Sequence, residues 1–346
     1  MQRVGAVLAA LAMIGISIWV RNVFFDDDDG GSGASGSLQL VCATELGAAC
    51  EELDVDVTIE DAGVTYERLL SVPNADRDEL GIDGWLTLAP WPQMVSEERA
   101  RRGLAPVLDT PTGAIARSPL VIAVRTEREV VLEGACDAPV RWPCLGEQSR
   151  RPWADLAGGN SGWGQVEVGH ADPTTSAVGL LVLGQATTEF FGDEPDGLST
   201  QDLDNPELGF RTWLDALEAS GVAPSFNRFL TTPTFDAVGT TEAEAGPALA
   251  AARSDIQEDV TLLYLEPVVT ADVVFAATVG GSDAGESLER AVTGDDAREA
   301  LAAAGWRVDG QDRSAGVRDE PALPGTSGLP SPGLLQALQE RWREVA

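Results

Sequence analysis

Short apolar segments alternate along this chain with stretches in which apolar residues recur at helical spacing. The segments typical of strands are residues 38–41, 55–59, 83–90, 119–124, 166–169, 260–265 and 268–276. The stretches typical of helices are residues 45–53, 65–70, 176–191, 210–220, 297–304 and 333–345. Because parallel strands need a long crossover, which is usually a helix, this alternation predicts an α/β fold built on a parallel sheet.

The amino-terminal segment, residues 1–25, has the pattern of a signal or membrane anchor. An apolar run at residues 4–20 lies between Arg3 and Arg21 and would span about 25 Å as a helix, a length at which short anchors and long signal cores overlap. We expect an uncleaved transmembrane helix, with a cleaved signal as the alternative. Residues 26–37 end in GGSGASGS and read as a flexible linker. Either interpretation places the body outside the cytoplasm, anchored at the cell membrane or secreted.

Four cysteines fit an oxidising compartment. Cys42 and Cys50 are eight positions apart, as are Cys136 and Cys144, which suggests two local disulfides, although three connectivities are possible. A continuous helix would separate two such α-carbons by about 12 Å, too far for a bridge, so Cys42 should precede the helix that carries Cys50. A zinc site is not expected, because the chain has no CxxC motif and a single histidine. We predict no metal and no cofactor.

The charge of the chain excludes one class of partner. Its 23 basic residues, all arginine, face 56 acidic ones, for a net charge of −33. Such a surface repels phosphate backbones, so we expect no nucleic-acid partner.

The stretch VGHADPTTSAVGLLVLG at residues 168–184 reads as a strand that runs into a helix amino terminus. Thr174, Thr175 and Ser176 would stand beside unpaired backbone N–H groups at the positive end of the helix dipole, with His170 on the approach. That arrangement suits an anion or a polar solute. The plainer interpretation is an ordinary helix cap, since Asp, Thr and Ser are common capping residues.

The order of these segments resembles type II periplasmic solute-binding proteins, in particular the molybdate-binding group. The stretches that carry the resemblance are Cys42-Ala43-Thr44-Glu45-Leu46, Asp83-Gly84-Trp85 followed by Trp91, residues 116–124, residues 169–176, and residues 305–307 with 334–342. Ala43-Thr44 replaces the paired serines of the molybdate pattern, and Trp85 and Trp91 would lie near the cleft, so molybdate itself is not expected.

The resemblance implies two Rossmann-like lobes joined by a hinge, with the solute trapped between them. Residues 38–125 would begin the first lobe, residues 126–261 would form the second, and residues 262–346 would return to the first with the carboxyl-terminal helices. The residues expected to contact the solute are Thr44, Trp85, Thr87, Ser118, His170, Thr174, Thr175 and Ser176. Helix capping by Thr44 and core packing of Trp85 and Trp91 remain open alternatives.

The function expected from this resemblance is capture of a small polar or anionic solute, delivered to an ABC-type permease or another membrane protein. A sensing or interaction module of the same fold is the alternative, because fold does not fix function. A cell-surface hydrolase is a weaker alternative. Ser176, His170 and Asp172 have the residue types of a triad, but they lie within seven positions and lack a Gly-x-Ser-x-Gly elbow. We therefore expect a binding protein and not an enzyme.

Overall fold

The computed structural model describes residues 38–73, 80–136, 139–192, 195–219, 221–222 and 225–346. The expected anchor and linker, residues 1–25 and 26–37, lie outside the described residues. No helix within the described ranges is both long and apolar enough to cross a membrane. Residues 38–346 form one compact unit.

The strands of this unit form one mixed sheet in the order β2-β1-β3-β8-β4-β6-β5, with β7 paired to β4. They are β1 (Gln39–Ala43), β2 (Asp56–Glu60), β3 (Gly84–Leu88), β4 (Ala116–Arg125), β5 (Val168–His170), β6 (Ala237–Thr241), β7 (Val260–Tyr264) and β8 (Thr270–Ala277). β1 is parallel to β2 and β3, and β5 is parallel to β6. β8 is antiparallel to β3 and β4, and β4 is antiparallel to β6 and β7. The predicted parallel sheet is therefore right for two groups of strands and wrong for the strands that join them.

Strand β4 belongs to both halves of the sheet. Residues 116–119 pair with β8, whereas residues 120–125 pair with β6 and β7. The change of partner falls at Pro119, which has no backbone N–H to donate to a ladder. β4 thus joins the β2-β1-β3-β8 half of the sheet to the half that contains β5, β6 and β7, and its residues 120–125 lie between β6 and β7.

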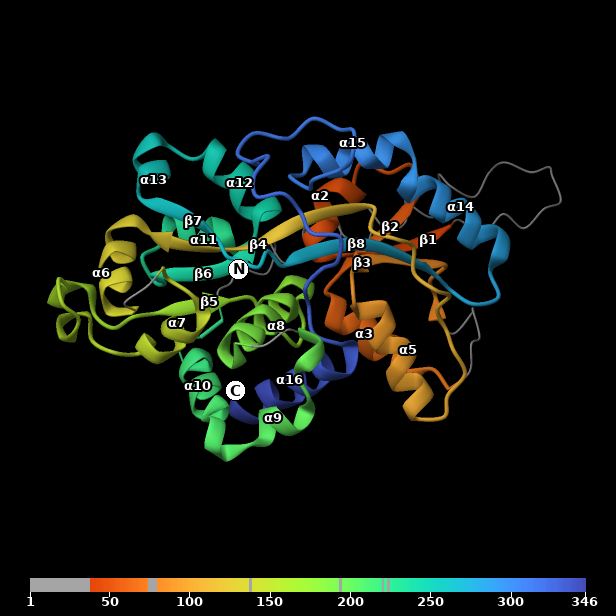
Figure 1. Ribbon diagram of the computed structural model, residues 1–346. Helices are drawn as coiled ribbons and strands as arrows, with labels where there is room; N and C mark the ends of the chain where they lie inside the picture. The colour runs from red at the N-terminus through yellow and green to blue at the C-terminus, as the bar shows by residue number, and fades with distance from the viewer. Residues whose placement is uncertain (1–37, 74–79, 137–138, 193–194, 220, 223–224) are drawn as a thin grey trace, which may run out of the picture. The chain divides into compact units, whose positions relative to one another are not determined.

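Helices cover both faces of the sheet (Figure 1), which explains why β3 and β6 are buried along their whole length. The short helices η1 (Thr44–Leu46) and α2 (Gly47–Cys50) follow β1. The helices of the first half of the chain are α3 (Ala62–Ser71), α5 (Trp91–Arg101), α6 (Thr126–Cys136), α7 (Trp142–Gln148) and α8 (Ala177–Phe191). Those of the second half are α9 (Thr200–Asp204), α10 (Phe210–Glu218), α11 (Phe226–Thr231), α12 (Glu242–Ala251), α13 (Ser254–Glu258), α14 (Ser282–Thr293), α15 (Asp295–Ala303) and α16 (Pro332–Val345).

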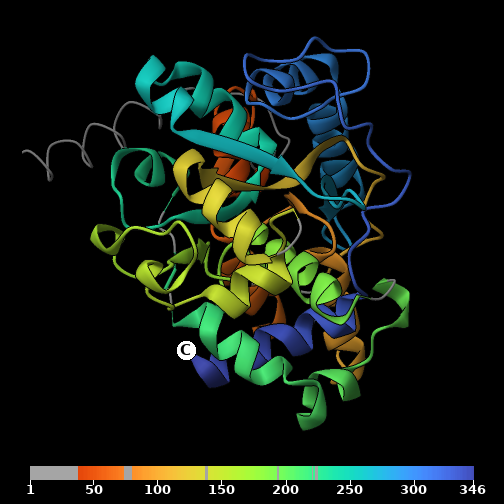
Figure 2. The ribbon, with the colours of Figure 1, turned by 60° about the vertical axis from the view of Figure 1, so that its left-hand side comes forward.

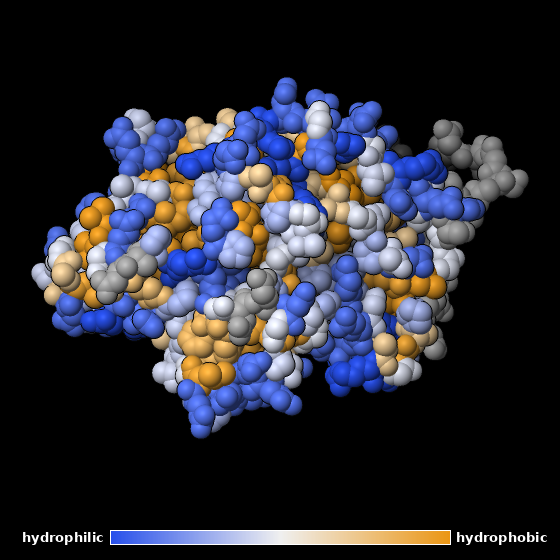
Figure 3. Space-filling model, viewed as in Figure 1, coloured by the Kyte–Doolittle hydropathy of each residue, from blue (hydrophilic) through white to orange (hydrophobic). Residues whose placement is uncertain are grey.

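The apolar helix α8 has both of its ends marked in the sequence. Ser176 caps its amino terminus, and Gly192 ends it in a left-handed conformation with φ 65°. Most of its residues are buried because α7, α16 and the sheet pack around it. The packing of α16 beside α8 and α10 is visible from two directions (Figures 1 and 2). On the face in Figure 3, hydrophilic residues are spread over most of the elements, as the large acidic excess leads one to expect.

Both expected disulfides are confirmed. Cys42 pairs with Cys50 across a Cα–Cα distance of 6.6 Å, and Cys136 pairs with Cys144 across 5.7 Å. Cys42 lies in β1 and Cys50 ends α2, so the chain turns between them as the geometry required. The expected helix at residues 45–53 is correspondingly shorter and is divided into η1 and α2.

Helix α3 approaches the loop between β5 and α8 very closely at Gly63. The Gly63 N–H donates to the Thr175 carbonyl at 2.9 Å, and a Cβ placed on Gly63 would lie 2.1 Å from the Thr174 carbonyl oxygen. We expect Gly63→Ala to destabilise the protein by about 1–3 kcal/mol, because backbone must move to admit the methyl group. Urea unfolding measures this loss. Gly113→Ala is the control, since no atom lies within 4 Å of its Cβ position, and equal losses in both variants would contradict the close contact.

Candidate functional site

A cavity of about 610 Å³ lies where the carboxyl ends of four strands come together. The lining residues at these ends are Thr44 after β1, Asp61 after β2, Ala171 after β5 and Thr241 at the end of β6. In open α/β sheets, ligands bind in the crevice outside the carboxyl ends of parallel strands. The two parallel groups of strands therefore direct their connecting loops into one shared space.

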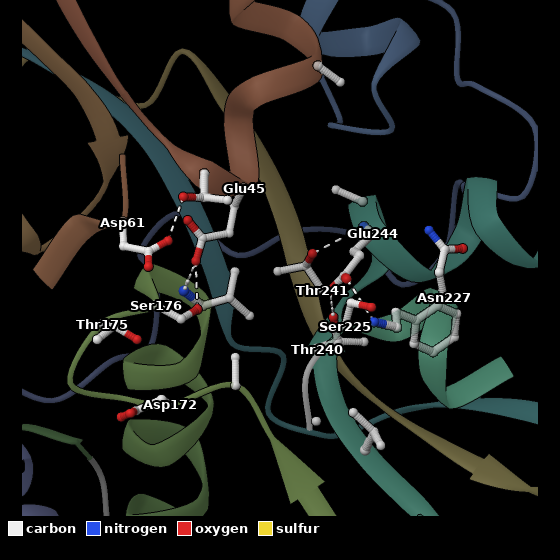
Figure 4. A pocket seen from close by; sticks show the side chains of 18 of the residues that line it. Glu45, Asp61, Asp172, Thr175, Ser176, Ser225, Asn227, Thr240, Thr241 and Glu244 are labelled. Atoms are coloured by element: carbon white, nitrogen blue, oxygen red, sulfur yellow. Dashed lines mark hydrogen bonds between the residues drawn. The ribbon is translucent and has the colours of Figure 1, made fainter. Parts of the chain in front are cut away.

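The lining residues come from both halves of the sheet. Glu45 and Asp61, which follow β1 and β2, lie on one side of the opening near Ser176 (Figure 4). Thr240 and Thr241 at the end of β6 and Glu244 in α12 lie on the other side (Figure 4). The apolar part of the wall includes Val178, Phe226, Val238 and Trp306. The cavity thus combines carboxylates, hydroxyls and aromatic rings.

The chain's own Glu45 occupies the amino terminus of α8. Glu45 Oε1 accepts a hydrogen bond from Ser176 Oγ at 2.6 Å and one from the Val178 N–H at 3.1 Å. Ser176 Oγ in turn accepts from the Gly179 N–H at 3.0 Å. The positive end of the helix dipole favours a carboxylate at this place. The donors that the sequence analysis assigned to an anion or polar solute therefore already bind an internal carboxylate.

The surroundings of Glu45 nevertheless disfavour its charged form. Burial raises the pKa of its carboxyl group above 4.5, and the hydrogen bonds from Ser176 and the first amides of α8 only partly offset this. Its second oxygen, Oε2, is buried and has no hydrogen-bond partner. Because a buried carboxylate oxygen without a donor is costly, this atom favours a ligand that brings one.

Other carboxylates around the cavity also accept hydrogen bonds from hydroxyl groups. Thr44 Oγ1 donates to Asp61 Oδ1 at 2.6 Å. On the opposite side, Glu244 accepts from Thr240 Oγ1 at 2.5 Å and from the Phe226 N–H at 3.0 Å. Thr44 and Ser176, whose hydroxyls were expected to donate to a solute, thus donate to acidic side chains instead.

Three of the eight expected solute contacts line the cavity, namely Thr44, Thr175 and Ser176. Thr44 follows β1 and Thr175 lies between β5 and α8. Thr175 and Ser176 lie on the same side of the opening as Glu45 and Asp61 (Figure 4), and not opposite them as the two-lobe interpretation expected. Thr174 lies beside the cavity but does not line it. Its N–H and Oγ1 both donate to Asp172 Oδ1, at 2.8 Å and 2.7 Å, so it shapes the loop.

Trp85 and Thr87 do not line the cavity, and the expectation that they contact solute there is corrected. Both belong to β3, which pairs with β1 and β8 and has no exposed face. Trp85 and Thr87 are each 0% exposed. The plainer interpretation of core packing, kept open for Trp85, is the one that the structure supports.

Ser118 and His170 likewise do not line the cavity. Ser118 is buried in β4, where its Oγ accepts from the Ala243 N–H at 2.9 Å and so satisfies the start of α12. His170 is buried in β5 with its ring 4.8 Å from that of Trp342, and burial lowers its pKa. Both side chains hold secondary structure together instead of facing a solute.

Sequence reasoning missed most of the acidic lining. The missed polar residues are Glu45, Asp61, Asp172, Ser225, Asn227, Thr240, Thr241 and Glu244. Some signals were present: Thr241-Glu242-Ala243-Glu244 has the spacing of a capping box after an apolar run, and Thr241 Oγ1 does accept from the Glu244 N–H at 3.2 Å. Asp61 likewise follows a predicted strand and precedes a predicted helix.

The hydrogen bonds at Ser176 do not form a hydrolytic triad. Its hydroxyl donates to Glu45, whereas His170 Nδ1 contacts the Ala171 carbonyl at 2.7 Å. Nor is any group of three or more His, Cys, Asp or Glu side chains within the described ranges placed to hold a metal ion.

Comparison with known proteins identifies the family. The model of bacterial extracellular solute-binding proteins matches residues 53–307, which is most of the chain. The chain belongs to this family. The resemblance inferred from sequence is thereby confirmed at the level of solute-binding proteins, and the family places this one outside the cytoplasm. No curated protein sequence matches the chain.

Solved structures show the same fold in several other solute-binding proteins. A periplasmic thiamin binding protein is 14% identical, with 92% of this chain and 98% of that chain covered and a TM-score of 0.56. A Trichodesmium protein in complex with iron and citrate is 9% identical, with coverages of 90% and 99% and a TM-score of 0.55. A periplasmic binding protein from Actinobacillus pleuropneumoniae with bound fructose-6-phosphate is 11% identical, with coverages of 90% and 97% and a TM-score of 0.53. At these identities the similarity concerns the fold.

Proposed function

We propose that this extracellular solute-binding protein captures a small polar solute in the 610 Å³ cavity and presents it to an ABC-type permease. The observation that carries the proposal is the meeting of strand ends from both halves of the sheet around one lined space. A cavity of this volume is within the usual range for small-molecule sites. The mechanism is capture without chemistry, in which the two halves surround the solute and exclude water from its polar groups.

Several finer features belong to the same proposal. One lobe consists of residues 38–125 and 262–346 and the other of residues 126–261, so the chain passes from one lobe to the other at the end of β4 and within β7. β4 and the chain after β7 form the hinge. The apolar segment before residue 26 exports the body and holds it at the membrane, and residues 26–37 give it reach. The ligands of the three similar structures differ in charge and size, so the fold leaves the solute open and the lining decides it.

The first test asks whether solute binds in this cavity. A solute present at 100 times its dissociation constant stabilises the native state by about 2.7 kcal/mol, which raises the melting temperature by roughly 5 °C. We expect a screen of the full-length chain in mild detergent to find such a solute. We further expect Ala48→Trp, which fills the cavity from α2, to abolish the shift.

The matched control is Ala100→Trp. Ala100 is also an exposed alanine on a helix but does not line the cavity, so this variant should keep the full shift. A solute whose stabilising effect survives Ala48→Trp unchanged would show that it binds elsewhere and would overturn the site assignment.

A further inference from the structure

Every charged side chain that lines the cavity is acidic. The lining carboxylates are Glu45, Asp61, Asp172 and Glu244, and none of the lining residues that the structure describes is an arginine or a histidine. The chain has no lysine. A negative solute would therefore be repelled by several carboxylates without any countercharge, whereas a positive one would be attracted by all of them.

The hydrogen bonds in the cavity wall also favour a positive solute. Thr44, Ser176 and Thr240 each donate their hydroxyl hydrogen to a lining carboxylate. The N–H groups of Thr175 and Ser176, which an anion would need, donate to the Asp172 carbonyl at 3.2 Å and 2.8 Å. This part of the wall still offers acceptors, including the buried and unpartnered Oε2 of Glu45, beside the hydroxyl of Thr175.

The remaining wall is apolar and aromatic. Phe226 and Trp306 line the cavity together with Val178 and Val238. Glu45 and Glu244 lie on opposite sides of the opening (Figure 4), so the acidic groups surround a volume and do not converge on a single ion. Aromatic rings attract cations through their faces, and apolar walls favour a ligand with an organic body.

We infer that the solute is an organic cation of the ammonium or pyridinium type, held by the carboxylates of both walls and by the aromatic lining. This inference rests on the proposed function, since it names the chemical class that the same cavity takes.

The test compares cations with neutral molecules of the same shape. The probes are choline and its carbon isostere 3,3-dimethylbutan-1-ol, putrescine and butane-1,4-diol, and the pyridinium cation 1-methylnicotinamide and nicotinamide, each titrated calorimetrically into the full-length chain. We expect at least one cation to bind about tenfold or more tightly than its neutral partner, since a charge beside several partly buried carboxylates gains at least that much. Citrate, phosphate and Ca²⁺ complete the panel and should not compete with it.

Charge-removing variants assign the effect to the cavity. We expect Glu45→Gln and Asp61→Asn each to lower the affinity for the cation about tenfold and to leave the affinity for its neutral partner unchanged. Each amide keeps an oxygen that accepts the existing hydrogen bond from the hydroxyl group. Glu207→Gln removes one exposed charge away from the cavity and should change affinity less than about twofold, because exposed distant charges are screened.

Two kinds of result would separate this inference from the proposed function. If no cation of the panel binds more tightly than its neutral partner, the cation assignment is wrong. If in that case a neutral or anionic solute or Ca²⁺ binds and Ala48→Trp abolishes that binding, the cavity stands. If a cation binds and Ala48→Trp leaves its affinity unchanged, both the cation assignment and the proposed site are wrong.

Discussion

Replacing Glu242 with alanine is expected to lower the free energy of unfolding by about 3–5 kcal/mol, because it leaves a buried guanidinium without its countercharge. Glu242 opens α12, and its oxygens accept from Arg307 Nε at 2.6 Å and Arg307 Nη2 at 2.9 Å. The two side chains are 0% and 1% exposed. Tyr264 of β7 also donates its hydroxyl to Glu242 Oε1 at 2.6 Å.

The loss of stability in Glu242→Ala involves more than the Glu242–Arg307 ion pair, because both residues belong to a larger buried cluster. The Arg307 backbone pairs with Arg117 of β4, and Arg307 Nη1 donates to the Pro321 carbonyl at 2.7 Å. Trp306, the preceding residue, lines the cavity. Glu242 therefore connects α12 and β7 to the chain that leaves α15 and supports one wall of the site.

Urea unfolding of the full-length chain measures the effect of Glu242→Ala. The exposed pair of Asp204 and Arg341, joined at 2.7 Å, supplies the control, since Asp204→Ala removes an ion pair that water already screens. The double variant Glu242→Leu with Arg307→Met should regain part of the loss, because apolar replacement of both partners removes the unpaired charge. A loss no larger than that of Asp204→Ala would contradict the role assigned to Glu242.

The features that sequence predicted well are those set by neighbouring residues. The disulfide between Cys42 and Cys50 follows from a spacing of eight and a turn that must separate a strand from a helix. The cap of α8 at Ser176 follows from a hydroxyl residue before an apolar run. Part of residues 168–184 lines the cavity, because the carboxyl end of a strand marks the ligand side of a parallel group, whereas His170 and Thr174 do not line it.

The acidic character of the site depends on contacts between distant segments. Glu45 and Ser176 are 131 positions apart, and no local pattern indicates that one carboxylate will cap the other segment's helix. Trp85 and Thr87 were misassigned for a related reason. The sequence placed them on a strand near the cleft but could not show that β8 would return antiparallel beside β3 and enclose it.

Cation binding is expected to strengthen as the pH rises and to become constant once Glu45 is fully ionised. Burial holds the pKa of Glu45 above 4.5 in the unliganded protein, and a cation beside the carboxylate would lower that pKa. Below the raised pKa, binding must therefore release a proton, and affinity should change by up to about tenfold per pH unit. Calorimetric titrations of the best cation from near pH 4.5 upward measure this slope.

Two variants assign the pH dependence to one carboxyl group. Asp61 and Asp172 line the same side of the cavity as Glu45 (Figure 4). Asp61→Asn should therefore weaken cation binding but keep the dependence of affinity on pH, whereas Glu45→Gln should remove that dependence. If the affinity of Glu45→Gln for the cation still depends on pH as strongly as that of the wild-type protein, the proton released on binding comes from another group.

The same pKa shift makes an opposite prediction for stability without ligand. A carboxyl group whose pKa is raised on folding contributes stability below its unfolded value near 4.5, and this contribution is lost as the pH rises through the folded value. Glutamine at position 45 is neutral at every pH and can still accept from Ser176 and Val178. At neutral pH, Glu45→Gln should therefore melt no lower than the wild-type protein, although it binds the cation more weakly. A large drop in its melting temperature at neutral pH would contradict this prediction and would show that the charge of Glu45 stabilises the fold. A carboxylate kept for a ligand is instead expected to cost stability in the unliganded protein.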